Sequence, residues 1–200
     1  MLCIRGASTR ALALSLAPLL TSLALLTACA TPARQPADRA YSGRFAVTTT
    51  YAEQRESVSG RFGLEIRGVQ QILELSSPLG TTVARIEVEP GGARATGAQM
   101  QEVRGADADV LTEKLLGWPL PVSGLADWIE GRPVPSRVAR VEREGGRIVL
   151  LEQDGWTIHL PEYFEVSGAS ARPRRLTLER PAAAKSPSVV LRLIVDEPAG

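Results

Sequence analysis

The 200-residue chain carries 23 lysine and arginine residues against 22 aspartate and glutamate residues, which gives a net charge of +1. A charge so close to zero argues against a nucleic-acid partner, because such partners need a basic surface. With one histidine, His159, and two cysteines, Cys3 and Cys29, the chain lacks the ligands of the common zinc sites, so we expect no bound metal.

Residues 1–28 have the features of a secretory signal. A basic segment with Arg5 and Arg10 precedes the apolar run "ALALSLAPLLTSLALL", which is shorter than the roughly 20 residues of a membrane-spanning helix. The following "LTAC", residues 26–29, matches the bacterial lipobox, in which the cysteine becomes the first residue and is acylated. We therefore expect Cys29 to carry the lipid. The alternative is an ordinary signal peptide with a chance cysteine.

Residues 29–40, "CATPARQPADRA", are small and polar and contain proline, which is typical of a flexible tether. Residues 41–200 then have the length and apolar content of one folded domain. Because Cys3 lies in the removed segment, the mature chain has no second cysteine and cannot form an internal disulfide bond.

Alternation of apolar and polar residues dominates the domain. In "VSGRFGLEIRG" the apolar Val58, Phe62, Leu64 and Ile66 share one parity, which predicts a half-buried antiparallel strand. A first strand is predicted over 44–51, and similar runs recur to the C-terminus, about eleven in all, separated by Gly-rich turns. The pattern predicts a mainly β fold, a curved antiparallel sheet or an incomplete barrel.

Residues 106–131 are the one helical region. Asp107 or Asp109 can cap a first helix that ends at Gly117, and a second helix runs from about Ser123 to Glu130. Both helices are short and amphipathic, so we expect them to cover the concave face of the sheet or to plug its open end.

The sequence offers no arrangement typical of an enzyme. His159 has the opposite parity to Trp156 and Ile158, which favours an exposed strand residue, and there is neither a G-x-S-x-G elbow nor a phosphate-binding loop. We therefore expect a protein without catalytic activity and without a cofactor.

One hairpin turn carries an unusual residue. "SSPLG", residues 76–80, joins two predicted strands and places Leu79 between Pro78 and Gly80, where a polar residue is the norm. Either the turn folds under and buries the leucine, or the leucine is presented to a partner.

Four stretches, "SGRFAV", "ELSSPLGTTVARIEV", "LLGWPLPVSGLADWIEGRP" and "QDGWTIHLPEY", occur in the order found in the LolB family, which the domain resembles from about residue 41 to 195. The resemblance implies an unclosed antiparallel barrel with helices over an apolar cavity. It also implies an outer-membrane receptor that faces the periplasm, accepts lipoproteins from the carrier LolA, holds their acyl chains and inserts them into the outer membrane. The family's exposed loop leucine corresponds to Leu79, flanked by Pro78 and Gly80, as a membrane-contact loop.

The same resemblance predicts a monomer whose partners are LolA, acylated cargo and outer-membrane lipid. Ala30, after Cys29, favours the outer membrane over inner-membrane retention. The alternative function is a structural or adaptor lipoprotein that binds protein and not acyl chains. Each apolar residue near the expected cavity is also compatible with ordinary core packing; the candidates are Phe45, Phe62, Leu64, Leu115, Leu116, Trp118, Trp128, Ile129, Trp156 and Ile158.

Overall fold

The computed structural model describes residues 36–98, 100–165, 171–184 and 186–197, which lie in a compact unit that starts at Pro36. The predicted signal peptide, Cys29 and most of the predicted tether lie outside the described residues. The elements are β1 (Arg39–Tyr51), β2 (Gln54–Arg67), β3 (Gln70–Ser76), β4 (Thr82–Glu89), β5 (Gly92–Gly97), β6 (Met100–Gly105), α1 (Ala108–Leu116), α2 (Val122–Ile129), β7 (Ala139–Glu144), β8 (Arg147–Gln153), β9 (Trp156–Tyr163), β10 (Pro173–Arg180) and β11 (Ser188–Val195).

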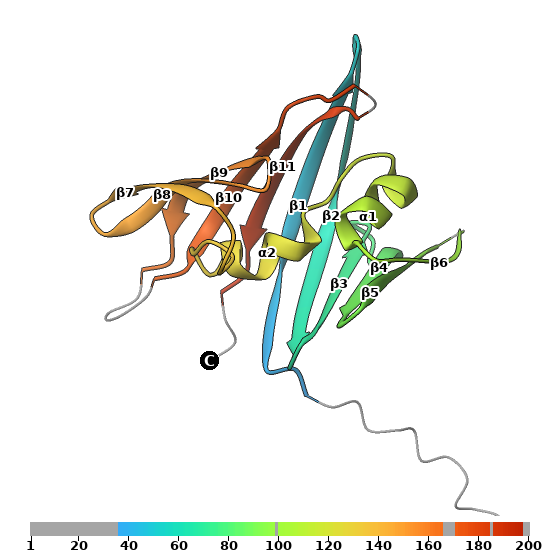
Figure 1. Ribbon diagram of the computed structural model, residues 1–200, viewed down its shortest axis with the longest axis horizontal. Coiled ribbons are helices and arrows are strands. Elements are labelled where there is room, and N and C mark those ends of the chain that lie inside the picture. The colour runs from blue at the N-terminus through green and yellow to red at the C-terminus, as the bar shows by residue number, and fades with distance from the viewer. Residues whose placement is uncertain (1–35, 99, 166–170, 185, 198–200) are drawn as a thin grey trace, which may run out of the picture. The chain divides into compact units, whose positions relative to one another are not determined.

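All eleven strands belong to one antiparallel sheet, in the order β6-β5-β4-β3-β2-β1-β11-β10-β9-β8-β7. The chain folds as two meanders, before and after the helices, and the pairing of β1 with β11 joins them. The strands β6 and β7 at the two ends of this order do not pair, so the sheet is curved but unclosed (Figure 1). This confirms the predicted fold class.

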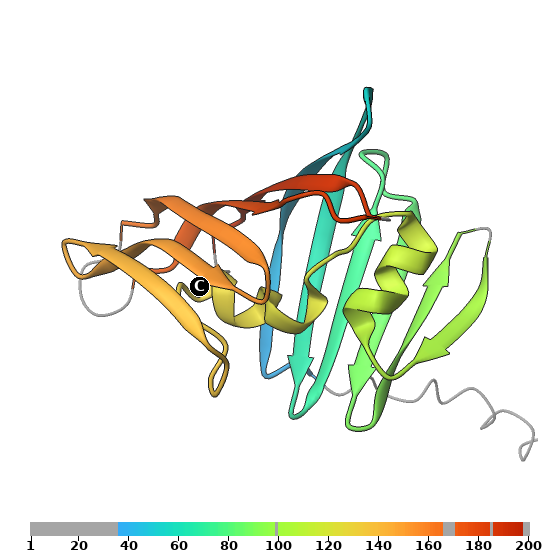
Figure 2. The same cartoon turned by 45° about the horizontal axis from the view of Figure 1, so that its top comes forward.

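The two helices lie on the concave side of the sheet, between its two halves (Figure 2). Alternate residues of each strand point toward the helices. Because most of these residues are apolar, the sheet face beneath the helices is apolar. Leu64 of β2 is paired with Leu73 of β3, and both are fully buried. The buried residues of both meanders and both helices form one hydrophobic cluster.

Strand β1 begins at Arg39, five residues before the predicted start at 44 and two before the predicted domain boundary at 41. It pairs with β2 along its whole length, with Tyr41 opposite Leu64 and Gly43 opposite Phe62. Gly43 is required there, since a Cβ would lie 2.7 Å from the Phe62 ring and 2.2 Å from the carbonyl oxygen of Ile194. Gly43 therefore makes room for the Phe62 ring where β1 lies between β2 and β11.

The β1–β2 hairpin projects beyond its neighbours (Figure 1). Pairing of β2 with β3 starts only at Arg61 opposite Ser76, so residues 54–60 of β2 have β1 as their one neighbour. Val58, which shares its parity with the core residues of β2, is consequently 53% exposed. Its predicted place on the buried face was wrong, because burial depends on the neighbouring strand as well as on parity.

Helix α1 begins after Asp107, whose carboxylate accepts hydrogen bonds from the backbone N–H groups of Asp109 and Val110. It ends at Gly117, whose φ of +79° is a left-handed conformation that favours glycine. Asp109, the alternative cap, instead binds the start of α2, where it accepts from the backbone N–H (3.1 Å) and the hydroxyl (3.0 Å) of Ser123. Asp109 therefore fixes the two helices to each other.

Candidate functional site

The turn between β3 and β4 holds Leu79 in a defined conformation. The backbone N–H of Gly80 donates to the carbonyl oxygen of Ser77 (2.9 Å), and that of Ser77 donates to the carbonyl oxygen of Thr81 (2.8 Å). The Ser77 hydroxyl oxygen also accepts from the N–H of Thr81 (3.2 Å). Pro78 fixes φ at the second position of the turn, and Gly80 has a φ of +87°. Leu79 is thus presented by a closed, hydrogen-bonded loop.

The Leu79 side chain is 95% exposed. The alternative in which the turn folds under and buries this leucine is therefore excluded by the structure. A leucine on a closed loop has nearly all its apolar surface available for contact with an apolar phase. Its proposed contact with a membrane remains a prediction.

Between sheet and helices, the space around Phe45, Phe62 and Trp118 is almost filled. Among the predicted lining residues, Phe45, Phe62 and Trp118 surround a central void of about 10 Å³. That volume is about enough for one water molecule. The predicted acyl-binding cavity is therefore closed around these residues in this structure. The void is completed by Leu73, Leu75, Leu120, Leu125, Leu191 and Leu193.

The other predicted lining residues contribute to the same core without reaching the void. Leu115 and Leu116 of α1 are partly buried and pack against the core. The remaining five, Leu64, Trp128, Ile129, Trp156 and Ile158, are fully buried. The sequence analysis did not name several leucines that border the void, although alternation could have identified four of them. In their strands, single polar residues separate Leu73 from Leu75 and Leu191 from Leu193.

Polar contacts at both ends of α2 hold it over the sheet. At its start, the Gln71 side-chain amide donates to the carbonyl oxygen of Val122 (2.5 Å). At its end, the Tyr41 hydroxyl donates to Glu130 Oε1 (2.6 Å), and the Arg172 guanidinium lies 3.7 Å from the same oxygen. Burial and the hydrogen bond to Glu130 raise the pKa of Tyr41 to about 12, so this phenol remains a donor at physiological pH.

A buried polar residue ties α2 to the second meander. Gln153 of β8 is 3% exposed, and its Oε1 accepts from the Trp128 indole N–H (2.9 Å) and the Val134 backbone N–H (2.8 Å). Its amide nitrogen donates to the carbonyl oxygen of Val134 (3.2 Å). Each polar group that Trp128 and Gln153 bring into the core is therefore satisfied.

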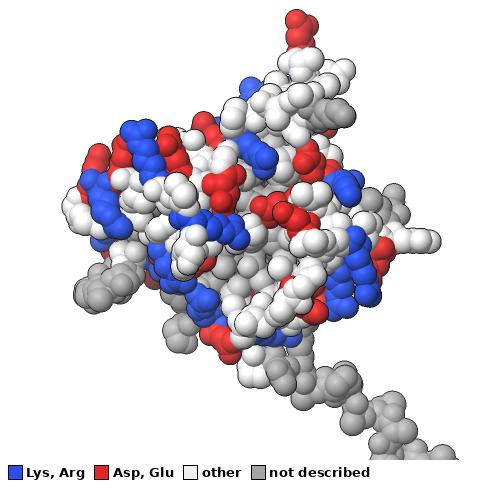
Figure 3. Space-filling model, viewed as in Figure 1, with Lys and Arg blue, Asp and Glu red and all other residues white. Residues whose placement is uncertain are grey.

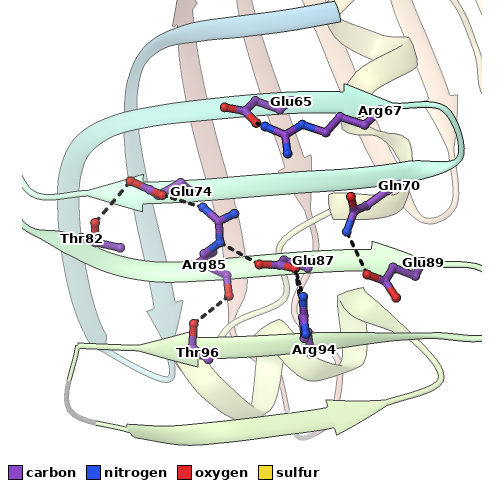
Figure 4. Close-up of polar contacts among 10 residues, drawn as sticks. All are labelled: Glu65, Arg67, Gln70, Glu74, Thr82, Arg85, Glu87, Glu89, Arg94 and Thr96. Carbon is purple, nitrogen blue, oxygen red and sulfur yellow. Dashed lines mark hydrogen bonds and ion pairs between the residues drawn. The ribbon is translucent and has the colours of Figure 1, made fainter. Parts of the chain in front are cut away.

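Four carboxylates of β2 to β4 lie on the outward face and are paired with arginines or polar groups: Glu65, Glu74, Glu87 and Glu89. Arg85 binds Glu74 (3.0 Å) and Glu87 (2.8 Å), and Glu87 also binds Arg94 (Figure 4). Figure 3 looks onto the other side, which carries the helices, and shows charges of both signs scattered over it, while the projecting hairpin is mostly uncharged. Such pairs are structural, and no two carboxylates are set apart for acid–base chemistry among these strands.

The described residues offer neither a cluster of metal ligands nor a membrane-spanning helix. They contain no group of three or more His, Cys, Asp or Glu side chains placed to hold a metal ion. Neither α1 nor α2 is long and apolar enough to cross a membrane.

Comparison with known proteins identifies relatives of the whole domain. The family model of the outer membrane lipoprotein LolB matches residues 38–197. The chain is 39% identical over 169 residues to an outer-membrane lipoprotein LolB of Cupriavidus pinatubonensis, covering 78% of this chain and 82% of the relative. It is 44% identical over 140 residues to that of Thiobacillus denitrificans, covering 69% and 70%. A crystal structure of a LolA superfamily protein from Nitrosomonas europaea is similar with a TM-score of 0.44 and 11% identity, covering 82% of this chain and 86% of that one.

Proposed function

Because the chain belongs to the LolB family of outer-membrane lipoproteins, we propose that it is an outer-membrane-anchored receptor that faces the periplasm. It accepts lipoproteins from the carrier LolA, holds their acyl chains between sheet and helices, and inserts them into the outer membrane. The observation that carries this proposal is Leu79, 95% exposed on a closed, hydrogen-bonded turn. The proposed anchor is an acyl group on Cys29.

Acceptance of cargo requires the interior to open. A void of about 10 Å³ holds no acyl chain, so the helices and the Trp118 segment must separate from the sheet. Contact between the acyl chain and the apolar lining compensates for this separation, since each methylene group that leaves water contributes about 0.8 kcal/mol. The hydrogen bonds of Tyr41 with Glu130, of Gln71 with Val122 and of Trp128 with Gln153 must lengthen or break as α2 moves.

Release is assigned to the Leu79 turn. A leucine that moves from water into an apolar phase gains roughly 1.5–3 kcal/mol, which favours contact of this loop with the bilayer but cannot anchor the protein alone. The stable attachment would come from the acyl group on Cys29. The loop then directs the opened interior toward the membrane that receives the cargo. No covalent step is needed, so the proposed protein is not an enzyme.

The proposal is tested by uptake of an acylated lipoprotein from LolA by the chain from residue 30 onward, which contains the complete compact unit. We expect the wild type to take up cargo and Leu116→Glu to take up much less, because this partly buried site packs against the apolar core that must open to the acyl chains, where an unpaired charge is costly. Val138→Glu, at a site 96% exposed, is the control and should behave as wild type. Binding of LolA without any transfer of acylated cargo would favour the adaptor alternative.

A further inference from the structure

A hollow of about 420 Å³ lies on the outward face of the sheet, beside the turn that carries Leu79. It faces away from the helices, because Arg44 and Ala46 alternate along β1 with the buried Phe45 and Val47. The hollow is separate from the apolar interior described above. It is bordered by Arg44, Arg61, Arg192, Ala46, Ile194 and Pro78.

Small residues create the hollow and bring the turn to its rim. Ala46 of β1 stands directly opposite Ser59 of β2, so two short side chains form the floor. The next residue, Gly60, allows the end of β3 to approach closely, since a Cβ there would lie 2.0 Å from the carbonyl oxygen of Ser76. This close approach places Pro78, the neighbour of Leu79, at the edge of the hollow.

The hollow has an excess of positive charge. The Arg61 guanidinium lies 3.4 Å from Asp196 Oδ2, which also accepts from the Ser42 hydroxyl (2.9 Å). Arg44 and Arg192 make no ion pair within the part of the chain that the structure describes. On the neighbouring strands of this face, Arg85 and Arg94 are by contrast paired with carboxylates (Figure 4). Three guanidinium groups therefore share one carboxylate around a partly apolar floor.

We propose that this hollow binds the phosphate headgroup of an anionic phospholipid when the Leu79 turn contacts the bilayer. The inference rests on the proposed function, because it takes Leu79 as the group that enters the apolar layer. Pro78 belongs to both the turn and the hollow, so insertion of Leu79 brings the three arginines to the level of the headgroups. A guanidinium matches a phosphate through two parallel hydrogen bonds, and its aliphatic stem can lie on the floor formed by Ala46 and Ile194.

Binding of the unacylated chain from residue 30 onward to vesicles of phosphatidylcholine, with or without phosphatidylglycerol, tests this inference. Wild type should bind more tightly when phosphatidylglycerol is present. The double variant Arg44→Gln/Arg192→Gln should lose about 30-fold on those vesicles, from the usual contribution of two arginines at an anionic surface. The control Arg104→Gln/Arg140→Gln removes the same charge from β6 and β7, at sites whose side chains are 73% and 69% exposed, and should lose far less.

Three results would overturn the inference: wild-type binding by Arg44→Gln/Arg192→Gln, an equal loss in the control, or no effect of phosphatidylglycerol on wild type. Inorganic phosphate at constant ionic strength separates the lipid from the free anion. Phosphate could raise the melting temperature of wild type but not that of Arg44→Gln/Arg192→Gln, while the two proteins bind vesicles equally well. In that case the hollow is a site for free phosphate. Leu79→Glu on phosphatidylcholine vesicles tests the proposed function separately. If this substitution does not weaken binding, the proposed role of Leu79 is wrong, whereas the comparison of the arginine variants is unaffected.

Discussion

Replacement of Leu79 should weaken membrane contact without affecting the fold. The side chain is 95% exposed, so Leu79→Ala removes almost no buried surface, and the free energy of unfolding should change by less than about 0.5 kcal/mol. The same exposure makes nearly the whole side chain available to lipid. Its transfer is worth roughly 1.5–3 kcal/mol, which corresponds to about a 10- to 100-fold loss of affinity for vesicles.

The assay is flotation of the chain from residue 30 onward with phosphatidylcholine vesicles, which carry no net charge and so minimise the effect of surface arginines. Leu79→Glu should bind more weakly than Leu79→Ala, because a carboxylate opposes entry into the apolar layer. Val69→Glu is the matched control, since Val69 is 78% exposed in the β2–β3 turn at the opposite end of these strands. Equal flotation of wild type and Leu79→Ala, or a loss of stability above about 2 kcal/mol in Leu79→Ala, would refute the reasoning.

Three further predictions concern the core, the helix pair and the anchor. Gln153→Leu should lower the free energy of unfolding by about 2–5 kcal/mol, because the N–H groups of Trp128 and Val134 lose their buried acceptor; an unchanged midpoint in urea would contradict this. Burial raises the pKa of Asp109 above its ordinary 3.8, so the folded state binds this proton more tightly than the unfolded state and the wild type loses stability as pH rises through the raised pKa. Asp109→Asn should lack that part of the pH dependence when stability is measured by urea unfolding. If the stability of wild type and of Asp109→Asn changed with pH in parallel, the prediction would be wrong. Cys29→Ala should abolish palmitate labelling and release the protein from the outer-membrane fraction, whereas unchanged fractionation would exclude the predicted anchor.

Much of the fold could be predicted because its signals are local. Alternation placed Phe62, Leu64 and Ile66 on one buried face, and the structure confirms all three. The ends of α1 followed from the capping chemistry of Asp107 and Gly117. These features depend on residues close together in the chain, so the sequence alone contains them.

Other features depend on partners far apart in the chain. Val58 has the parity of a core residue but extends past the end of β3, which no local pattern reveals. Asp109 was a plausible cap for its own helix, yet its partner is Ser123 of the next helix. The near absence of a void around Phe45 and Trp118 likewise depends on how leucines from β3, from β11 and from the helical region fit together.

The candidate site likewise has some features that the sequence predicts and others that only the structure reveals. The unusual leucine in a Pro–Leu–Gly turn was visible in the sequence, but whether it was buried or exposed required the structure, which gives 95% exposure. The arginine hollow had no sequence signal, because Arg44, Arg61 and Arg192 come from three strands that meet only through the pairing of β1 with β2 and β11. A near-zero net charge concealed this local excess of positive charge.

The most direct test of the proposed receptor function follows one acylated lipoprotein from LolA to the Leu79→Glu variant and then into liposomes. The interior is unchanged in this variant, so uptake from LolA should proceed at the wild-type rate. Delivery into the liposomes should fall at least about tenfold, because the turn no longer favours the bilayer. Delivery at the wild-type rate, or failure already at uptake, would contradict the account.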